Sequence, residues 1–300
     1  MPIDPSTLSW WSLIPQHLDP ALFTLFGDRL FEFGSSASGA GFAVRWYGVG
    51  YLLAFWTVWL WMKRTMRVER IDFPEEHFEL MFTWAIVGVL VGARLGYVLF
   101  YNPGFYLSHP LQIVFPTSNG HFAGIAGMSF HGGVIGALVC TIGIARRRNI
   151  DWRKYYNLLC YSIPLGYTWG RLGNFMNGEL YGRPTESAVG MLFPHDPQQT
   201  LRHPSQLYEA FGEGLLLFGV LTLLRRVWPK SHVLMGPLYV FGYGVVRFFV
   251  EFFREPDAHI GLGFLNLIRG KFLCVAMMAG AVLWAFLELR REREAAAAKP

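Results

Sequence analysis

The feature that most constrains this chain is a series of long apolar runs that hold very few Asp, Glu, Lys or Arg residues. The hydrocarbon core of a bilayer is about 30 Å thick, and a helix needs about 20 residues to cross it. Arg94 interrupts the second run, and Arg247 and Glu251 interrupt the sixth. The runs cover residues 46–62, 80–101, 122–145, 155–170, 207–224, 233–253 and 272–287. The sequence therefore predicts an all-α polytopic membrane protein with about seven transmembrane helices.

Composition supports this fold class and excludes others. Hydrophobic residues make up 53% of the chain and charged residues 16%, and the mean hydropathy is +0.30, which is too apolar for an ordinary soluble domain. The net charge of +5 comes without the basic, aromatic-rich face of a nucleic-acid-binding module. Cys140, Cys160 and Cys274 lie in separate apolar runs without C-x-x-C spacing. We expect neither a disulfide nor a metal site, and no cofactor.

The basic residues between the runs predict an orientation. Sixteen of the 26 lie in the segments that follow the first, third, fifth and seventh runs, whereas the alternate segments hold eight. Cytoplasmic loops carry the excess of Lys and Arg in membrane proteins. The sequence therefore predicts an N-terminus outside the membrane and a C-terminus in the cytoplasm.

The runs and the segments between them divide the chain into five parts. We expect an exported N-terminal arm, in which residues 21–33 form an amphipathic helix, and a small exported head without helical periodicity between the fourth and fifth helices. The parts are residues 1–45 (arm), 46–170 (helices one to four), 171–206 (head), 207–289 (helices five to seven) and 290–300 (cytoplasmic tail).

The string GRLGNFMNGELYG, residues 170–182, places polar groups directly after an apolar run. Arg171 supplies a fixed charge and a forked donor that suits phosphate. Asn174 and Asn177 can donate to phosphate or ester oxygens, and Gly182 permits close backbone approach. Alternatively, Arg171 reaches to the membrane interface and the asparagines cap a helix. Glu179 belongs to the same string and is a further candidate for binding substrate.

A second cluster lies in the sixth run. Tyr243, Arg247, Glu251 and Arg254 are spaced by four, four and three residues, which predicts one helical face. Glu251 could simply neutralise the two arginines. We favour an anion-binding stripe, because the positive charges are in excess.

Isolated residues extend the candidate site. His131 lies near the start of the third run, where it is either a packing residue or a base that accepts a thiol proton. Tyr47 is either part of an aromatic belt or catalytic. Arg94 is expected to point away from the glycines of its helix, toward another helix or a polar cavity. In RHPSQLYE, His203 and Glu209 are candidates to assist, although the segment equally fits an ordinary helix start.

Six segments together resemble the prolipoprotein diacylglyceryl transferase family: RWYG, GARLGYVLFYN, SFHGG, GRLGNFMNGELYG, RHPSQLYE and GYG..R...EFFREPD. The resemblance implies an enzyme of the bacterial cytoplasmic (inner) membrane that moves the diacylglyceryl group of phosphatidylglycerol to the lipobox cysteine of a prolipoprotein signal peptide. A thioether would form and glycerol phosphate would leave. The resemblance also favours His131 as the thiol base, with Glu179 and His203 as competitors, and Arg171 and Arg247 as the residues that stabilise the departing phosphate.

Two other function classes fit some of these features. A lipid flippase or transporter would also carry intramembrane arginines, but it would favour inverted repeats, which the sequence lacks. An intramembrane aspartyl protease would need aspartates within the runs, and none lies there. A serine protease would need a Ser–His pair, but Ser129 and His131 diverge on a helix.

Overall fold

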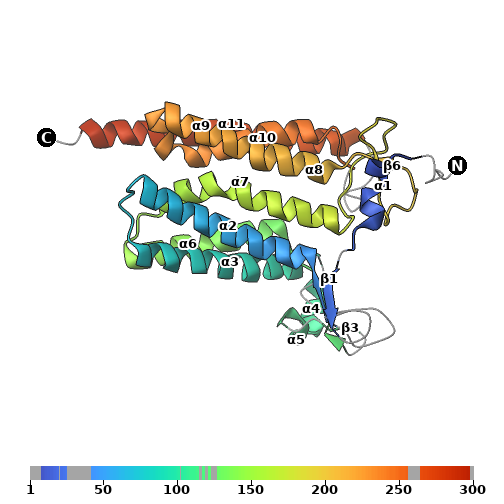
Figure 1. Cartoon of the computed structure of the whole chain (residues 1–300). Helices are drawn as coiled ribbons and strands as arrows, with labels where there is room; N and C mark the ends of the chain where they lie inside the picture. Colours follow the sequence, from blue (N-terminus) through green and yellow to red (C-terminus); the bar gives the residue numbers. More distant parts are fainter. Residues whose placement is uncertain are drawn as a thin grey trace. The chain divides into compact units, whose positions relative to one another are not determined.

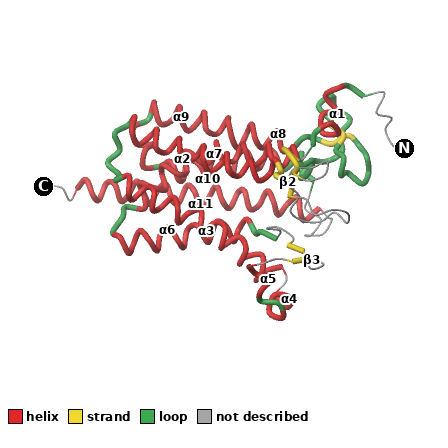
Figure 2. The backbone as a smooth tube through the Cα atoms, turned by 60° about the horizontal axis from the view of Figure 1, so that its bottom comes forward, coloured by secondary structure: helices red, strands yellow, loops and turns green. Residues whose placement is uncertain are grey.

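A computed structural model describes residues 8–19, 21–25, 42–101, 103–114, 117–118, 121–122, 127–255 and 264–297. Most of these residues are helical, and the strands are short (Figures 1 and 2). The chain forms two compact units. The first comprises Met1–Pro20, Arg45–Arg64 and Tyr156–Pro300, and the second comprises Ala21–Val44 and Thr65–Tyr155.

The first unit contains most of the long helices. Its elements are α1 (Trp10–His17), most of α2 (Trp46–Val68) and of α7 (Trp152–Met176), β5 (Met191–Leu192), β6 (Leu201–Arg202), α8 (Ser205–Glu209), the π-helix η2 (Ala210–Leu216), α9 (Leu217–Val227), the 3-10 helix η3 (Pro229–Val233), α10 (Met235–Val250) and α11 (Phe264–Ala297). A core of Tyr161, Leu217, Leu221 and Met235 joins α7, α9 and α10. Trp61 of α2 packs against this core. Burial of such large side chains stabilises the helices against one another.

The second unit is built on a pair of long helices. Its elements are β1 (Ala21–Leu25), β2 (Phe42–Arg45), α3 (Glu75–Tyr101), α4 (Pro103–Ser108), α5 (Leu111–Val114), β3 (Thr117–Ser118), β4 (His121–Phe122) and α6 (Phe130–Arg148). Glycines let α3 and α6 approach closely: a Cβ atom on Gly92 or Gly96 would lie 2.7 Å from the Cα of Gly136 or Gly132. This is the small-residue packing expected between membrane helices.

Local sequence explains where α6 begins and ends. Ser129 Oγ accepts a hydrogen bond from the N–H of Gly132 and caps the helix start. Asn149 ends the helix with a φ of 53°, a conformation that asparagine tolerates better than most residues.

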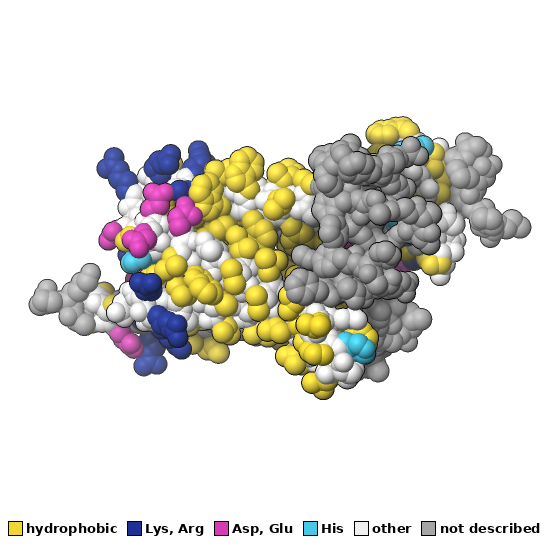
Figure 3. All heavy atoms as spheres, turned by 90° about the horizontal axis from the view of Figure 1, so that it is seen from below, with side chains coloured by type: hydrophobic (Ala, Val, Ile, Leu, Met, Phe, Trp, Pro, Cys, Tyr) yellow, Lys and Arg dark blue, Asp and Glu magenta, His cyan; other side chains and the backbone are white. Residues whose placement is uncertain are grey.

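Figure 3 shows Lys and Arg side chains gathered at one end of the face that it draws, next to a belt of hydrophobic side chains. Such a basic end beside an apolar belt is typical of a membrane protein.

Each of the seven predicted runs overlaps a helix. Within the described residues, three helical stretches are both long and apolar enough to cross a membrane: Glu75–Tyr101, Ser205–Val227 and Gly270–Ala297. Met235–Val250 is apolar but shorter. The structure therefore supports a helical membrane protein, while the number of seven spans stays a prediction.

Two predicted features near the head and the N-terminus are wrong. α7 continues to Met176, so the segment that starts at Arg171 is helical for its first six residues. Residues 21–25 form a strand paired with β2 and not the start of an amphipathic helix, while 26–33 lie outside the described residues. The helix that does form before residue 20 is α1, which docks on the head through Trp11 Nε1, a donor to the Val189 carbonyl.

The head is stabilised by an apolar cluster and by a buried ion pair. Phe175, Met191 and Phe193 form the cluster, against which Trp11 packs. Arg202 donates to Asp196 through Nε at 2.9 Å and NH2 at 2.8 Å, in a bidentate arrangement. Backbone N–H groups of residues 198 and 200 also donate to this carboxylate. The pair holds the loop between β5 and β6 in one conformation.

This ion pair predicts an acid limit for the head. Burial raises the pKa of Asp196, but the hydrogen bonds from Arg202 and from the backbone of Thr200 and Gln198 outweigh burial and lower the pKa from 3.8 to about 2. The folded carboxyl group binds its proton less readily than the unfolded one. Its stabilisation is therefore complete above about pH 4 and is lost as the pH falls through 2.

We expect hydrogen exchange in residues 190–202 to accelerate between about pH 4 and pH 2, after correction for the intrinsic rate. Asp196→Asn removes the charge, so it should give faster exchange at neutral pH and a smaller change with pH. An unchanged pH dependence in the variant would contradict the role assigned to this carboxylate.

Candidate active site

The helical stretch from Ser205 to Val227 changes its hydrogen-bond pattern at two glutamates. Glu209 ends α8, and Glu213 lies within the π-helix η2. Their exposed fractions are 1% and 0%. Thr168 Oγ1 of α7 donates to the Ala210 carbonyl at 3.4 Å and holds this wide turn against α7. π-Helical turns inside α-helices are frequent at functional sites, so this stretch is a candidate for one.

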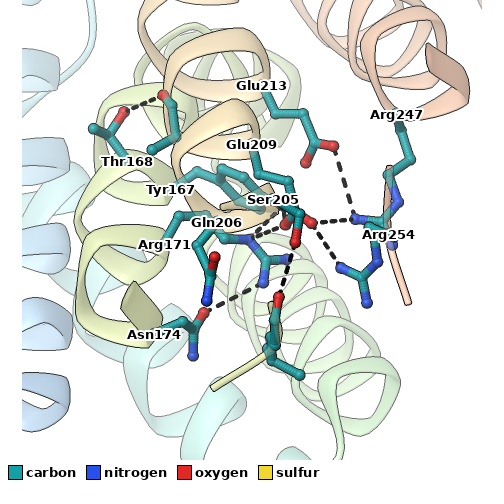
Figure 4. Close-up of polar contacts among 12 residues, drawn as sticks. Tyr167, Thr168, Arg171, Asn174, Ser205, Gln206, Glu209, Glu213, Arg247 and Arg254 are labelled. Carbon is teal, nitrogen blue, oxygen red and sulfur yellow. Dashed lines mark hydrogen bonds and ion pairs between the residues drawn. The ribbon is translucent and has the colours of Figure 1, made fainter. Parts of the chain in front are cut away.

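Three arginines contact the carboxylate of Glu209 (Figure 4). Arg171 Nε of α7 lies 2.6 Å from Oε2, and Arg254 NH1, beyond α10, lies 2.8 Å from Oε1. Arg247 NH1 of α10 is 3.4 Å from Oε1. Arg171 and Arg247, which the sequence analysis assigned to one site, therefore meet at one buried carboxylate. The cluster also contains a second carboxylate, that of Glu213, and a third arginine, Arg254.

Arg171 also belongs to a chain of hydrogen bonds that links Tyr167 to residues of GRLGNFMNGELYG. Arg171 donates through Nε to Tyr167 Oη at 2.7 Å and through NH1 to Asn174 Oδ1 at 3.3 Å. Asn174 Nδ2 donates in turn to Glu179 Oε1 at 2.8 Å, and Asn177 Nδ2 lies 3.4 Å from the same oxygen. Both amides thus donate to the Glu179 carboxylate, and Asn174 also orients the guanidinium group of Arg171.

Arg247 is held less tightly than the other two arginines. Besides Glu209, its neighbours are Glu213, with Oε1 3.8 Å from NH1, and Glu251, with Oε2 3.5 Å from Nε. Within the described part of the chain, Arg247 NH1 and both carboxylate oxygens of Glu213 make no hydrogen bond although they are buried. A buried donor without an acceptor is costly, and it marks the place where a ligand oxygen would fit.

The predicted helical face of the second cluster is only partly correct. α10 ends at Val250, so Arg254 lies past the helix, in a turn. The turn nevertheless brings Arg254 to Glu209. Tyr243 lies one helical turn before Arg247, and its ring meets the ring of Tyr167 edge to face at 5.9 Å.

Gly182 allows two segments of the head to meet the segment that follows α10. Its N–H donates to the His203 carbonyl at 2.8 Å, and it forms a β-bridge with Arg254. A Cβ atom at this position would collide with the Phe253 carbonyl and with His203. The His203 ring contacts Tyr208 Oη through Nδ1 at 3.1 Å, and burial lowers the pKa of His203. Gly182 thus helps to place Arg254, and His203 is favoured in its neutral form.

Tyr47 also lies in the first unit. It is in the first turn of α2, and its hydroxyl is 2.9 Å from that of Tyr51. A Cβ atom on Gly173 would lie 3.4 Å from the Tyr47 Cα, so the backbones of α2 and α7 are close at this level.

Arg94 and His131 belong to the second unit. Arg94 donates to the carbonyls of Gln112 (2.6 Å), Ile113 (2.8 Å) and Gly127 (3.2 Å), and so holds the connection between α3 and α6. His131 lies in the first turn of α6, with its ring edge to face against Phe130 at 5.7 Å.

Sequence reasoning missed two residues of the cluster and undervalued a third. Glu213 and Tyr167 were not considered, and Glu209 was weighed only as a helper. The available signal was the pair of glutamates four residues apart within an apolar run, the same pattern that singled out Arg247 and Glu251. Ionisable residues within a membrane span are expensive and mark functional sites.

Comparisons with known proteins identify the family of this chain. A family model described as prolipoprotein diacylglyceryl transferase matches residues 36–287. A phosphatidylglycerol–prolipoprotein diacylglyceryl transferase of Chlorobaculum tepidum is 44% identical over 283 residues, which cover 92% of this chain and 93% of the relative. Proteins of the same name from Wolinella succinogenes and Helicobacter pylori are 42% and 37% identical, over 94% and 95% of this chain and 98% and 99% of their own lengths. This chain belongs to the prolipoprotein diacylglyceryl transferase family.

Proposed function

We propose that this protein transfers the diacylglyceryl group of phosphatidylglycerol to the cysteine thiol in the lipobox of a prolipoprotein signal peptide. The family membership and the names of the relatives support this activity. A C–S bond forms at the glyceryl carbon next to the phosphate, and the C–O bond to the phosphate breaks. Glycerol phosphate leaves with the electron pair, and a base takes the thiol proton.

The observation that carries the proposal is the arginine cluster with an unfilled donor. Arg171, Arg247 and Arg254 converge on Glu209, and Arg247 NH1 has no hydrogen-bond acceptor in the described part of the chain. A phosphate oxygen next to Arg247 would accept a hydrogen bond from NH1. Because the phosphate gains negative charge as it leaves, fixed cations stabilise the transition state more than bound lipid.

His131 is the proposed thiol base, and Tyr47 is proposed as a second catalytic residue. A thiol with a pKa near 8.5 is mostly protonated at neutral pH, so a base raises the fraction of reactive thiolate. Two competitors are engaged: Glu179 accepts hydrogen bonds from two asparagine amides, and His203 contacts the Tyr208 hydroxyl. Their contacts favour roles as substrate-binding residues.

The remaining assigned residues are proposed to bind substrate. Arg94 would act through the connection that it holds between α3 and α6. The others lie in the first unit and are Asn174, Asn177, Glu179, Gly182, His203, Tyr243, Glu251 and Arg254.

We further propose the location and orientation that the sequence predicts. The protein would span the bacterial inner membrane, with its N-terminus outside and its C-terminus in the cytoplasm. This places the head on the side where exported precursors emerge, as their modification requires. The distribution of basic residues between the apolar runs supports this arrangement.

A direct assay separates the transferase from the alternative of a lipid flippase or transporter. Purified protein is incubated with phosphatidylglycerol and a lipobox peptide, and the peptide is analysed by mass spectrometry. We expect a diacylglyceryl adduct on the cysteine and one glycerol phosphate released per adduct. Movement of lipid between leaflets without any adduct would favour the transporter, which the family membership does not.

A further inference from the structure

Glu213 has a buried carboxyl group to which the mechanism above assigns no role. Its side chain is fully buried, and neither carboxylate oxygen makes a hydrogen bond within the described residues. Its ion-pair contact is with Arg247 NH1 at 3.8 Å, beyond hydrogen-bond length. A buried carboxylate that accepts no hydrogen bond is destabilising, so its presence calls for an explanation.

The other arginines do not need Glu213. Arg171 and Arg254 each form an ion pair with Glu209 at 2.8 Å or less, and Arg254 NH1 also donates a hydrogen bond to Oε1. The guanidinium nitrogens of Arg247 instead lie between 3.4 and 3.8 Å from the oxygens of three carboxylates and make no shorter contact with any of them. Among the three arginines, it is the one whose contacts are most easily exchanged for a phosphate oxygen (Figure 4).

The fold fixes Glu213 in this position. η2 is held against α7 through Thr168, which donates to Ala210, and through Gly214, where an added Cβ atom would collide with the Thr168 hydroxyl. Gly212 of the same turn packs on Val246, the neighbour of Arg247. The backbone at Glu213 therefore cannot move away from α10 without disrupting both helix contacts.

Charge balance shows what a carboxylate in this place does. Three arginines face three carboxyl groups, those of Glu209, Glu213 and Glu251, so the cluster is balanced before substrate binds when all three carboxyl groups are ionised. A phospholipid diester brings one negative charge, whereas a phosphate monoester product carries between one and a half and two at neutral pH. Arginines without a counter-charge would bind the product more tightly than the substrate and would slow its release.

We propose that Glu213 is the counter-charge that loosens Arg247 and so limits how tightly the site holds glycerol phosphate after transfer. The proposal rests on the phosphate-binding role given to the arginine cluster above. Glu213 acts through Arg247, so it is a positioning residue. It sets the balance between substrate capture and product release.

The test measures inhibition of thioether formation by added glycerol phosphate. Glu213→Gln removes the charge and keeps the shape, and Glu213→Leu replaces the carboxylate with an apolar group, which buried ionic sites often tolerate. Both should lower the inhibition constant by about tenfold or more, given a charge several Å from the phosphate at an effective dielectric of about 20. The KM for phosphatidylglycerol should fall less, and kcat should fall because release is slower. Glu213→Asp retains the charge and should keep the inhibition constant within about twofold of the wild type.

A merely structural role gives a different result. In that case all three Glu213 variants would weaken inhibition or leave it unchanged, and the proposal would be overturned. Arg247→Lys, measured in the same assay, separates this failure from failure of the phosphate site. If Arg247→Lys raises the inhibition constant while Glu213→Gln does not lower it, the site stands and the counter-charge role falls. If Arg247→Lys and Arg171→Lys both leave it unchanged, the phosphate site and the counter-charge role fall together.

Discussion

Replacing Arg171 with lysine should lower the rate of thioether formation by about 10²- to 10³-fold, although the charge is retained. Lysine cannot reproduce the fork that contacts Glu209, Tyr167 and Asn174 at the same time. The ammonium group would satisfy Glu209 and leave the other two partners without a donor. The phosphate would then meet a cation that is neither fixed nor correctly aimed. The rate is measured with excess lipobox peptide in phosphatidylglycerol micelles.

Arg290→Lys is the matched control for this change. Arg290 lies on α11 in an exposed pair with Glu294, so the same substitution there should leave the rate unchanged. The melting temperatures of both variants are compared with the wild type to separate lost chemistry from lost folding. A rate for Arg171→Lys within twofold of the control would contradict the role given to the forked guanidinium group of Arg171.

Replacing His131 with glutamine should cost on the order of 10² to 10⁴ in turnover, because a general base contributes about this much. Glutamine keeps a similar size and a donor but has no basic nitrogen. His131 lies in the first turn of α6, where Ser129 caps the helix, so the cap of this end does not depend on the imidazole. Binding of phosphatidylglycerol should therefore persist in the variant.

Dependence on pH distinguishes a lost base from a lost packing residue. Raising the pH toward the pKa of the peptide thiol, near 8.5, generates thiolate without a base, so it should partly restore the variant. A packing defect would not respond in this way. Near-normal turnover at neutral pH would remove His131 from the mechanism and leave Glu179 and His203 as the candidates, each testable by the same substitution to glutamine.

The apolar runs predicted the helices because hydrophobic length is a local property of the sequence. The helix ends were less accessible: Arg171 begins the polar part of GRLGNFMNGELYG, yet α7 continues to Met176. The structure shows why the helix can carry this polar end. Arg171 and Asn174 are paired with Tyr167 and Glu179, so their polar groups are satisfied within the fold.

The arginines of the site were predictable, but their arrangement was not. A cation within an apolar run or directly after one is easily seen in the sequence, and this pattern singled out Arg247 and Arg171. Glu209, which all three arginines contact, lies in a segment whose sequence equally fits an ordinary helix start. Glu213 comes to lie beside Arg247 through tertiary packing. The sequence does not show the π-helical turn between these glutamates, because its register depends on contacts with Thr168 of α7.

Photocrosslinking tests most directly whether the arginine cluster holds the lipid phosphate. A phosphatidylglycerol analogue with a diazirine on the headgroup glycerol is bound to the wild-type protein and irradiated, and the adducts are mapped by mass spectrometry. We predict adducts between Tyr167 and Asn174 and between Tyr243 and Arg254, which unlabelled phosphatidylglycerol and glycerol phosphate both suppress. Adducts that are suppressed in the same way but lie only in α3 or α6 would contradict the assignment.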